Sequence, residues 1–542
     1  MLYLAGVPTL AEVQSVRKEM KRAKKGPVQL EDLHDLKLLA VQATRPLELM
    51  PPLGTTVATA TAPAAPHHDS KLIHVPMDCA AYNTEGLVVT GPVQMRWLQQ
   101  LLERPRQFVL HVDGKHKLHH GGWVLMTVGT HRLRWDEHHH KLSTSFVPLM
   151  YQMCKQVESG SATTLGSAHM LLDSLNVACD TAFGKRLEPG AGVSDHCPAY
   201  FNAYEHAFPG MPRMQCYPHI ARKLAEGEYC SKTWEHFDAV TGHVRAIHLA
   251  MSASMRNLLL REIGLVWDKL GGGKHMDKFW NVNCIDPWNT WSVGLFDAPL
   301  CTPSNNTQEA WHRDLLRGRI PGMFRGSTEA VFKVALPQLA ELDGLLAPST
   351  LPFEVPAIPK AMMQNALWYV ANQATHVEAF EMADGTPAFY VMSRSNAGGA
   401  KRFTKKHHEM FQRAMLGELD SRIKDLASLI QVCQSVHIVC TPADGYEVLT
   451  CDGNPCKYEC LACKTFKGVG ICSHVLAINH ILQKFNLRYE LKQLQTRASK
   501  KQAAKAGKVV RPLPALQRAP VAQPDSSDEE DEAHLALGEQ GK

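Results

Sequence analysis

Residues 108–128 read FVLHVDGKHKLHHGGWVLMTV and contain two apolar runs separated by a Gly-Gly break. The first run, Phe108–Val112, alternates with a period of two and is rich in aromatic and β-branched residues. It predicts a buried or half-buried strand that ends at Asp113. The second run, Trp123–Val128, predicts a neighbouring strand that returns beside the first. A carboxylate at the end of an apolar strand is costly to desolvate without a partner such as a cation, although Asp-Gly after a strand is also a common turn.

The chain has 542 residues, of which 45% are hydrophobic, and a formal net charge of +5. These values describe a folded protein that is long enough for several domains. The small positive surplus permits a polyanionic partner, but it matters only where the charges are clustered. Because no stretch of about 18 uninterrupted apolar residues occurs and the first ten residues lack a basic segment, we expect neither membrane insertion nor export.

The two ends of the chain differ in composition from its middle. Residues 1–66 predict a basic helical segment followed by a Pro/Ala/Thr-rich linker. The helix expected over residues 9–25 gathers its Lys and Arg toward its end, which suits a solvated surface helix, a nucleic-acid contact or a nuclear-import signal. Residues 491–542 become Lys/Ala-rich, then Pro-rich, then acidic, and we expect a disordered tail.

Residues 67–325 alternate strand and helix patterns, which is typical of an α/β layer. Ser145–Cys154 predicts a third strand, and Ala162–Ala178 predicts a helix. A short element ends at Asp195, and the later segment MQCYPHI, residues 214–220, is strand-like.

A second group of patterns is mainly helical. Residues 225–300 predict an all-helical insertion with a tryptophan-rich end. Pro303–Arg317 begins with helix-capping residues and predicts a helix that carries Glu309. Residues 326–440 predict a mixed, mostly helical region.

Three acids therefore occupy comparable places in the predicted fold: Asp113, Asp195 and Glu309. Two of them follow strands that are expected to share a sheet, and the third lies on a helix that the insertion can return to the edge of that sheet. Converging carboxylates supply the hard oxygen ligands that Mg²⁺ or Mn²⁺ needs. A metal pair held in this way can activate an attacking oxygen and stabilise the leaving oxygen in phosphoryl transfer.

The same segments resemble the transposases of the Mutator-like element family. The resemblance lies in HVDGKHK around Asp113, SDHCPAYFNAYEHAFPG around Asp195, MQCYPHI, and SNNTQEAWHRDLL around Glu309. It implies an RNase H-like catalytic core, a mixed sheet with flanking helices and a helical insertion, in which these acids form an Asp, Asp, Glu triad. Asp314 is the alternative acid on the last helix. The family's Cys-x-x-His pair matches Cys216 and His219, although a core thiol and a capped histidine explain them equally well.

Seven of the fifteen cysteines fall between Cys433 and Cys472, which suits a metal site in a reducing compartment better than a disulfide framework. Four of the donors in this part of the chain can close a tetrahedral Zn²⁺ site: Cys460, Cys463, Cys472 and His474. Residues 441–490 thereby resemble the SWIM zinc finger, a small ββα module with the pattern Cys-x-Cys, spacer, Cys-x-His. Because two residues instead of one separate Cys460 from Cys463, Cys456 and Cys451 remain alternatives to Cys460.

Two functions compete. The first is a nuclear DNA transposase that uses Mg²⁺ or Mn²⁺ to cut and join DNA as a homo-oligomer, with no membrane and no small-molecule substrate. The second is a domesticated or inactive descendant that binds DNA or protein through the zinc module and performs no chemistry. The three acids favour the first function. The lack of a cysteine before Cys79 favours the second, because relatives often recognise DNA through an N-terminal cysteine finger. Lys21–Lys25 and Lys500–Arg511 are candidate DNA contacts or import signals.

Overall fold

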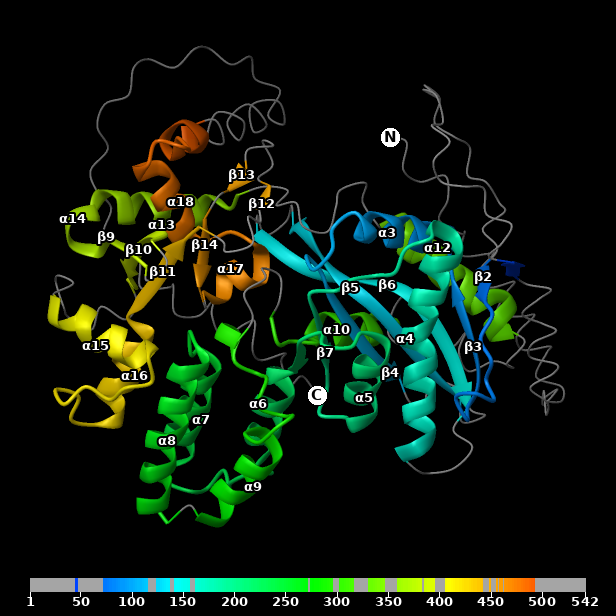
Figure 1. The fold of residues 1–542 in the computed structure, drawn as a ribbon, viewed down its shortest axis with the longest axis horizontal. Coiled ribbons are helices and arrows are strands. Elements are labelled where there is room, and N and C mark those ends of the chain that lie inside the picture. Colours follow the sequence, from blue (N-terminus) through cyan, green and yellow to red (C-terminus); the bar gives the residue numbers. More distant parts are fainter. Residues whose placement is uncertain are drawn as a thin grey trace, which may run out of the picture.

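The computed structural model describes residues 44–46, 72–115, 123–136, 141–155, 161–271, 273–295, 302–315, 330–346, 358–382, 385–394, 405–441, 448–449, 455–456, 458–461 and 463–492 (Figure 1). The expected N-terminal basic helix, most of the linker, the expected C-terminal tail from residue 493 onward and Cys451 lie outside these residues. None of the described helices is both long enough and apolar enough to span a membrane.

An eight-stranded mixed sheet has the order β1-β2-β3-β6-β5-β4-β7-β8. Strand β5 runs antiparallel to both of its neighbours, β4 and β6, whereas β7 and β8 continue the sheet in parallel with β4. The strands are β1 (Thr44–Pro46), β2 (Leu72–Val75), β3 (Glu85–Thr90), β4 (Val109–Lys115), β5 (Trp123–Asp136), β6 (Lys141–Lys155), β7 (Ala191–Ser194) and β8 (Arg213–Gln215). The expected α/β class is confirmed.

Two local predictions around this sheet are wrong. Strand β4 continues past Asp113 to Lys115, because Asp113 lies opposite Thr127 within the β4–β5 ladder. Backbone pairing with β5 therefore extends the strand beyond the end of its apolar run. The segment MQCYPHI is a strand only as far as Gln215, and Cys216 is the N-cap of a helix. Pro218 lies in the first turn of that helix, where its missing N–H has no helical partner to lose.

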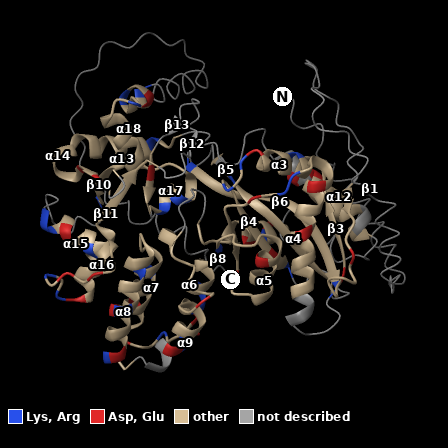
Figure 2. Cartoon of the chain, in the orientation of Figure 1, with Lys and Arg blue, Asp and Glu red and all other residues tan. Residues whose placement is uncertain are grey.

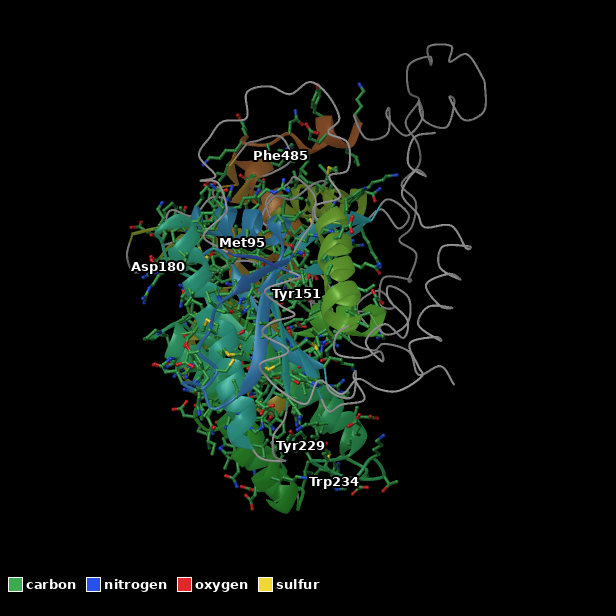
Figure 3. All side chains as sticks on the ribbon, turned by 90° about the vertical axis from the view of Figure 1, so that its right-hand side faces the viewer. Met95, Tyr151, Asp180, Tyr229, Trp234 and Phe485 are labelled. Atoms are coloured by element: carbon green, nitrogen blue, oxygen red, sulfur yellow. The ribbon has the colours of Figure 1, made fainter. Side chains whose placement is uncertain are left out.

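Helices cover both faces of the large sheet, because successive apolar side chains along its strands point to opposite faces and both sets have to be buried. Along β5, Val124 and Met126 belong to one hydrophobic core, whereas Trp123 and Leu125 belong to another. The first core also contains buried residues of α3 (Pro92–Leu102), α4 (Ser161–Phe183) and α5 (Pro198–Ala207). The second core contains those of α10 (Asn306–Asp314), η5 (Val331–Ala335) and α12 (Leu336–Leu346). Tyr151 of β6, labelled in Figure 3, belongs to this second core.

Between β8 and α10 the regular elements in the described residues are all helices. They form α6 (Tyr217–Glu226), α7 (Phe237–His248), α8 (Ala253–Lys269), α9 (Gly273–Asn283) and the short turn η2 (Val293–Leu295). In Figure 1 these green helices project away from the large sheet. Their buried residues share a core with α15 (Lys405–Met415) and α16 (Leu426–Gln434), so this helical layer is completed by segments much later in the chain.

A second sheet, of order β14-β11-β10-β9, contains part of the cysteine-rich segment. Its strands are β9 (Val377–Glu381), β10 (Pro387–Met392), β11 (Val436–Cys440) and β14 (Glu459–Leu461), and a separate pair is formed by β12 (Val448–Leu449) and β13 (Pro455–Cys456). Helices α13 (Lys360–Ala371), α14 (Gln373–His376), α17 (Lys464–Val469) and α18 (Ser473–Ile481) accompany them. Since β11 pairs with β14, the expected boundary between residues 440 and 441 falls between two strands of one sheet.

The large and small sheets meet at the end of the β5–β6 hairpin. Leu133 of β5 is 5% exposed and belongs to the same core as Phe466 of α17 and Val475 of α18. Figure 1 shows α17 beside the end of β5. The cysteine-rich segment is therefore packed against the sheet that carries Asp113.

We expect Gly166→Ala to destabilise the protein by about 1–3 kcal/mol, because there is no room for a larger residue. Gly166 lies on α4, and an added Cβ would come within 1.9 Å of the backbone oxygen of Tyr82. Gly264→Ala on α8 is the matched control, because an added Cβ there meets nothing within 4 Å. Urea denaturation should show a lower midpoint for Gly166→Ala alone; an unchanged midpoint would contradict this packing.

Candidate carboxylate and cysteine–histidine sites

Asp113 on β4 and Asp195, directly after β7, lie at matching positions of neighbouring strands. Strands β4 and β7 are parallel, and His111 lies opposite Val193. Asp113 is two residues beyond His111, and Asp195 is two residues beyond Val193. Because neighbouring strands are about 4.8 Å apart, the two carboxylates leave the same end of the sheet from adjacent backbone positions.

Glu309 joins this group through a histidine of α6. Oδ1 of Asp195 lies 3.0 Å from Nδ1 of His219, and Nε2 of the same ring lies 3.0 Å from Oε1 of Glu309. Arg222, one turn further along α6, lies 3.3 Å from the other oxygen of Glu309. Candidate ligand atoms of Asp195, Cys216, His219 and Glu309 all lie within 4.8 Å of one another. Glu309 therefore belongs to the site, whereas Asp314 is exposed on the same helix.

The charge on His219 offsets the repulsion between the carboxylates. Burial lowers the pKa of His219, but hydrogen bonds to Asp195 and Cys216 outweigh it and raise the pKa to about 10. Burial also raises the pKa of the Cys216 thiol, whose sulfur accepts a hydrogen bond of 3.2 Å from the backbone N–H of Asn305. His219 therefore lies between Asp195 and Glu309 and contacts both carboxylates.

Asp113 is held by a second histidine, which no pattern in the sequence distinguishes. Nδ1 of His312 lies 3.2 Å from Oδ2 of Asp113, and its Nε2 lies 3.2 Å from Oγ1 of Thr127. Gln308 donates a hydrogen bond of 2.9 Å to the backbone oxygen of Thr127. His312 follows Glu309 by three residues, so both lie on one turn of α10. His312 contacts Asp113 directly, and Glu309 is linked to Asp195 through His219.

A cavity of about 110 Å³ adjoins the carboxylates. Its walls include Asp195, His219 and Lys223, together with Gln215 and Asn283, which are 4% and 1% exposed. Tyr229, labelled in Figure 3, also lines it. The site therefore opens into a polar space with a basic side chain on its wall.

The sulfur atoms of the three predicted cysteine ligands lie at nearly equal distances from one ring nitrogen of the fourth ligand, His474. Nδ1 of His474 lies 3.6 Å from Sγ of Cys460 and 3.7 Å from Sγ of both Cys463 and Cys472. A tetrahedral Zn²⁺ with ordinary Zn–S and Zn–N bonds would separate sulfur from nitrogen by about 3.6 Å. Hydrogen bonds with Cys460 and Cys472 hold the pKa of Cys463 well below its usual value, which favours the thiolate that binds metals. The donors fit zinc in type and spacing.

A contact on the other ring nitrogen, Nε2, fixes the orientation of His474. Its Nε2 lies 3.2 Å from the hydroxyl of Tyr369 on α13, and that hydroxyl accepts a hydrogen bond of 3.2 Å from the backbone N–H of Arg394. A partner on the far ring nitrogen is typical of metal-binding histidines, because it fixes the tautomer and the ring direction. Nδ1 is thus left to face the three sulfurs.

His437 on β11 is a donor that the sequence analysis missed. Its ring stacks on that of His474 with 4.0 Å between centroids. Candidate ligand atoms of His437, Cys460, Cys463 and His474 lie within 4.8 Å of one another. Burial lowers the pKa of His437 to about 3, so the ring is neutral, as a metal ligand must be. The only signal in the sequence is a histidine on the apolar strand VHIVC.

This cluster can hold a metal ion through two different sets of four donors. Both sets contain Cys460, Cys463 and His474, and they differ in whether Cys472 or His437 is the fourth. Of the alternatives expected from the sequence, Cys451 lies outside the described residues. Only the backbone of Cys456 is described, on β13, where it lies opposite Val448.

The two sites differ in donor chemistry. The first offers two or three carboxylates with histidine and cysteine beside them, and the second offers sulfur and nitrogen alone. Hard cations prefer the oxygen ligands of the first site, and zinc suits the second. Neither a protein-family model nor a curated protein matches this chain, so its function has to be inferred from these two sites.

Proposed function

We propose that the protein is a metal-dependent DNA-cutting enzyme of the Mutator-like transposase kind, with Asp113, Asp195 and Glu309 as ligands of Mg²⁺ or Mn²⁺. The observation that carries this proposal concerns three acids: Asp195 and Glu309 contact the same histidine, His219, and Asp113 lies at the same end of the sheet on the strand next to β7. They are separated by 82 and then 114 residues in the sequence. A mixed sheet with one acid on a central strand, a second directly after its parallel neighbour and a third on a covering helix also supports an RNase H-like core.

The bound ions would activate the attacking oxygen of water or of a DNA 3′ end and stabilise the leaving oxygen. The protein's own residues prepare the site for this. His312 orients Asp113, while Arg222 and His219 hold Glu309. Lys223 on the cavity wall and Arg222 beside it offer positive charge to a phosphate backbone. Lys and Arg are interspersed with Asp and Glu around α8, α9, α15 and α16 in Figure 2, so these outer helices are weaker candidates for a DNA surface.

A structural Zn²⁺ held by Cys460, Cys463, Cys472 and His474 completes the proposal. The nearly equal distances from His474 to the three sulfurs support this set. The four residues are buried in a core that also contains Leu133 of the large sheet, so we propose that zinc stabilises the fold beside the nuclease site. A SWIM-type role in DNA or protein binding, a nuclear location and a homo-oligomer on DNA belong to the same proposal.

The test is a nicking assay on supercoiled plasmid DNA with Mg²⁺, Mn²⁺ or EDTA. We expect nicked product with either metal and none with EDTA. A folded, DNA-binding protein that gives no product would favour a transposase-derived binding factor without catalysis. One observation favours that second function, since His219 and Arg222 already neutralise the carboxylates without a metal.

We expect His312→Phe to raise the Mn²⁺ concentration needed for half-maximal cleavage by about tenfold or more, because partners behind metal ligands typically contribute this much. His312→Asn should retain most of the affinity, since its amide can replace the donor at Nδ1. The matched control is His206→Phe, which removes the 3.1 Å ion pair with Asp173 between α5 and α4. Equal Mn²⁺ dependence in all three variants would show that His312 does not position Asp113.

A further inference from the structure

The cysteine–histidine cluster contains one more donor than a tetrahedral ion can use. Three sulfurs surround Nδ1 of His474. The ring of His437 stacks on the ring of His474, with 4.0 Å between their centroids. Nδ1 of His437 is buried and has no hydrogen-bond partner among the residues that the structure describes. A buried nitrogen without a partner is unfavourable, and a metal ion bound among the neighbouring donors would satisfy it.

The backbone explains why His437 faces this cluster. Val439 of β11 lies opposite Cys460 of β14. His437 precedes Val439 by two residues and therefore shares its face of the sheet, so it is a diagonal neighbour of Cys460. Its candidate ligand atom lies within 4.8 Å of those of Cys460, Cys463 and His474.

We propose that His437 is a reserve ligand, which takes the fourth position on the metal when Cys472 leaves it. The two sets that result, Cys₃His and Cys₂His₂, are both ordinary for structural zinc. Cys472 is the donor most able to leave, because it lies in the short connection between α17 and α18, whereas Cys460 and His437 lie on paired strands. In the exchange the Zn–S bond breaks, the released thiolate takes a proton from water, and neutral His437 forms a Zn–N bond. No electron is transferred.

The experiment measures zinc per full-length chain and the absorption of the Co²⁺-substituted protein for four variants. They are Cys472→Ala, His437→Phe, the double variant and Cys472→Ala/Cys463→Ala as a control with two ligands removed. His437→Phe keeps a ring that can stack on His474 but has no donor nitrogen. We expect one metal in His437→Phe and about one in Cys472→Ala, with sulfur-to-Co²⁺ charge-transfer absorption lowered by about a third as three thiolates become two. Both double variants should bind at least about tenfold more weakly than Cys472→Ala.

A folded Cys472→Ala protein without metal would overturn the proposal, and so would equal metal affinity in Cys472→Ala and its double variant with His437→Phe. If Cys472→Ala does not fold, the wild type is compared with His437→Phe by the rate of zinc transfer to a chelator. A reserve ligand recaptures the ion whenever Cys472 opens. His437→Phe should therefore release zinc several-fold faster, and equal rates would reject the reserve role.

Discussion

Asp195→Asn should lower metal-dependent DNA cleavage by at least about 10³-fold while leaving the fold and DNA binding in place. A metal ion contributes several kcal/mol to stabilising the transition state, and about 4 kcal/mol corresponds to this factor. Asn keeps the size of the side chain and its oxygen can occupy the place of the carboxylate oxygen beside His219, so the neighbouring packing should survive. Initial rates of plasmid nicking with Mn²⁺ measure the effect.

The control for this prediction is Asp173→Asn. Asp173 is also a partly buried carboxylate beside a histidine, but it lies on α4 and pairs with His206 and Tyr82. It should cleave at the wild-type rate, as should Asp314→Asn. Asp113→Asn and Glu309→Gln should be as inactive as Asp195→Asn. Nicking by Asp195→Asn within tenfold of the wild type would exclude the carboxylate site as the source of cleavage.

Cys463→Ala should lose the zinc and with it the folded state of the C-terminal sheet and its helices. Structural zinc supplies about 10–16 kcal/mol in small metal-dependent domains, which is comparable to the whole stability of a typical protein. Cys463 is 4% exposed and lies in one core with Phe466 and Tyr458, so its loss removes both the ligand and the packing around it. Zinc content and limited proteolysis of the full-length chain measure the outcome, and chelation of the wild type should reproduce it.

Cys433→Ala is the matched control, because Cys433 is equally buried but lies on α16 in the core of the helical layer. It should keep its zinc and lose only packing energy. Since Leu133 of β5 belongs to the zinc-bearing core, Cys463→Ala should also slow cleavage. A Cys463→Ala protein that keeps one zinc and resists protease would show that another donor replaces this cysteine.

Local patterns in the sequence predicted many of the strands and helices of the fold. Alternation and β-branched residues located β4, β5 and β6, and helical spacing located α4 and α10, because these patterns report which side of a segment is buried. The order of Cys460, Cys463, Cys472 and His474 identified the cysteine–histidine cluster, since short spacings limit how far apart such donors can lie. The ends of the strands and helices were harder to predict from the sequence. Pairing of Asp113 with β5 extended β4, and the capping of α6 by Cys216 shortened β8.

Only the tertiary structure decided which distant residues meet. Periodicity shows that a face is buried but not what covers it, so the sequence could not place His219 between Asp195 and Glu309, or His312 beside Asp113. The same reason hid His437, whose nearness to the cysteines depends on the pairing of β11 with β14. Such contacts join segments tens to hundreds of residues apart, and the packing of whole layers selects them. The sequence by itself determined the α/β elements and the donor types, while the tertiary structure decided how those donors are shared between two sites.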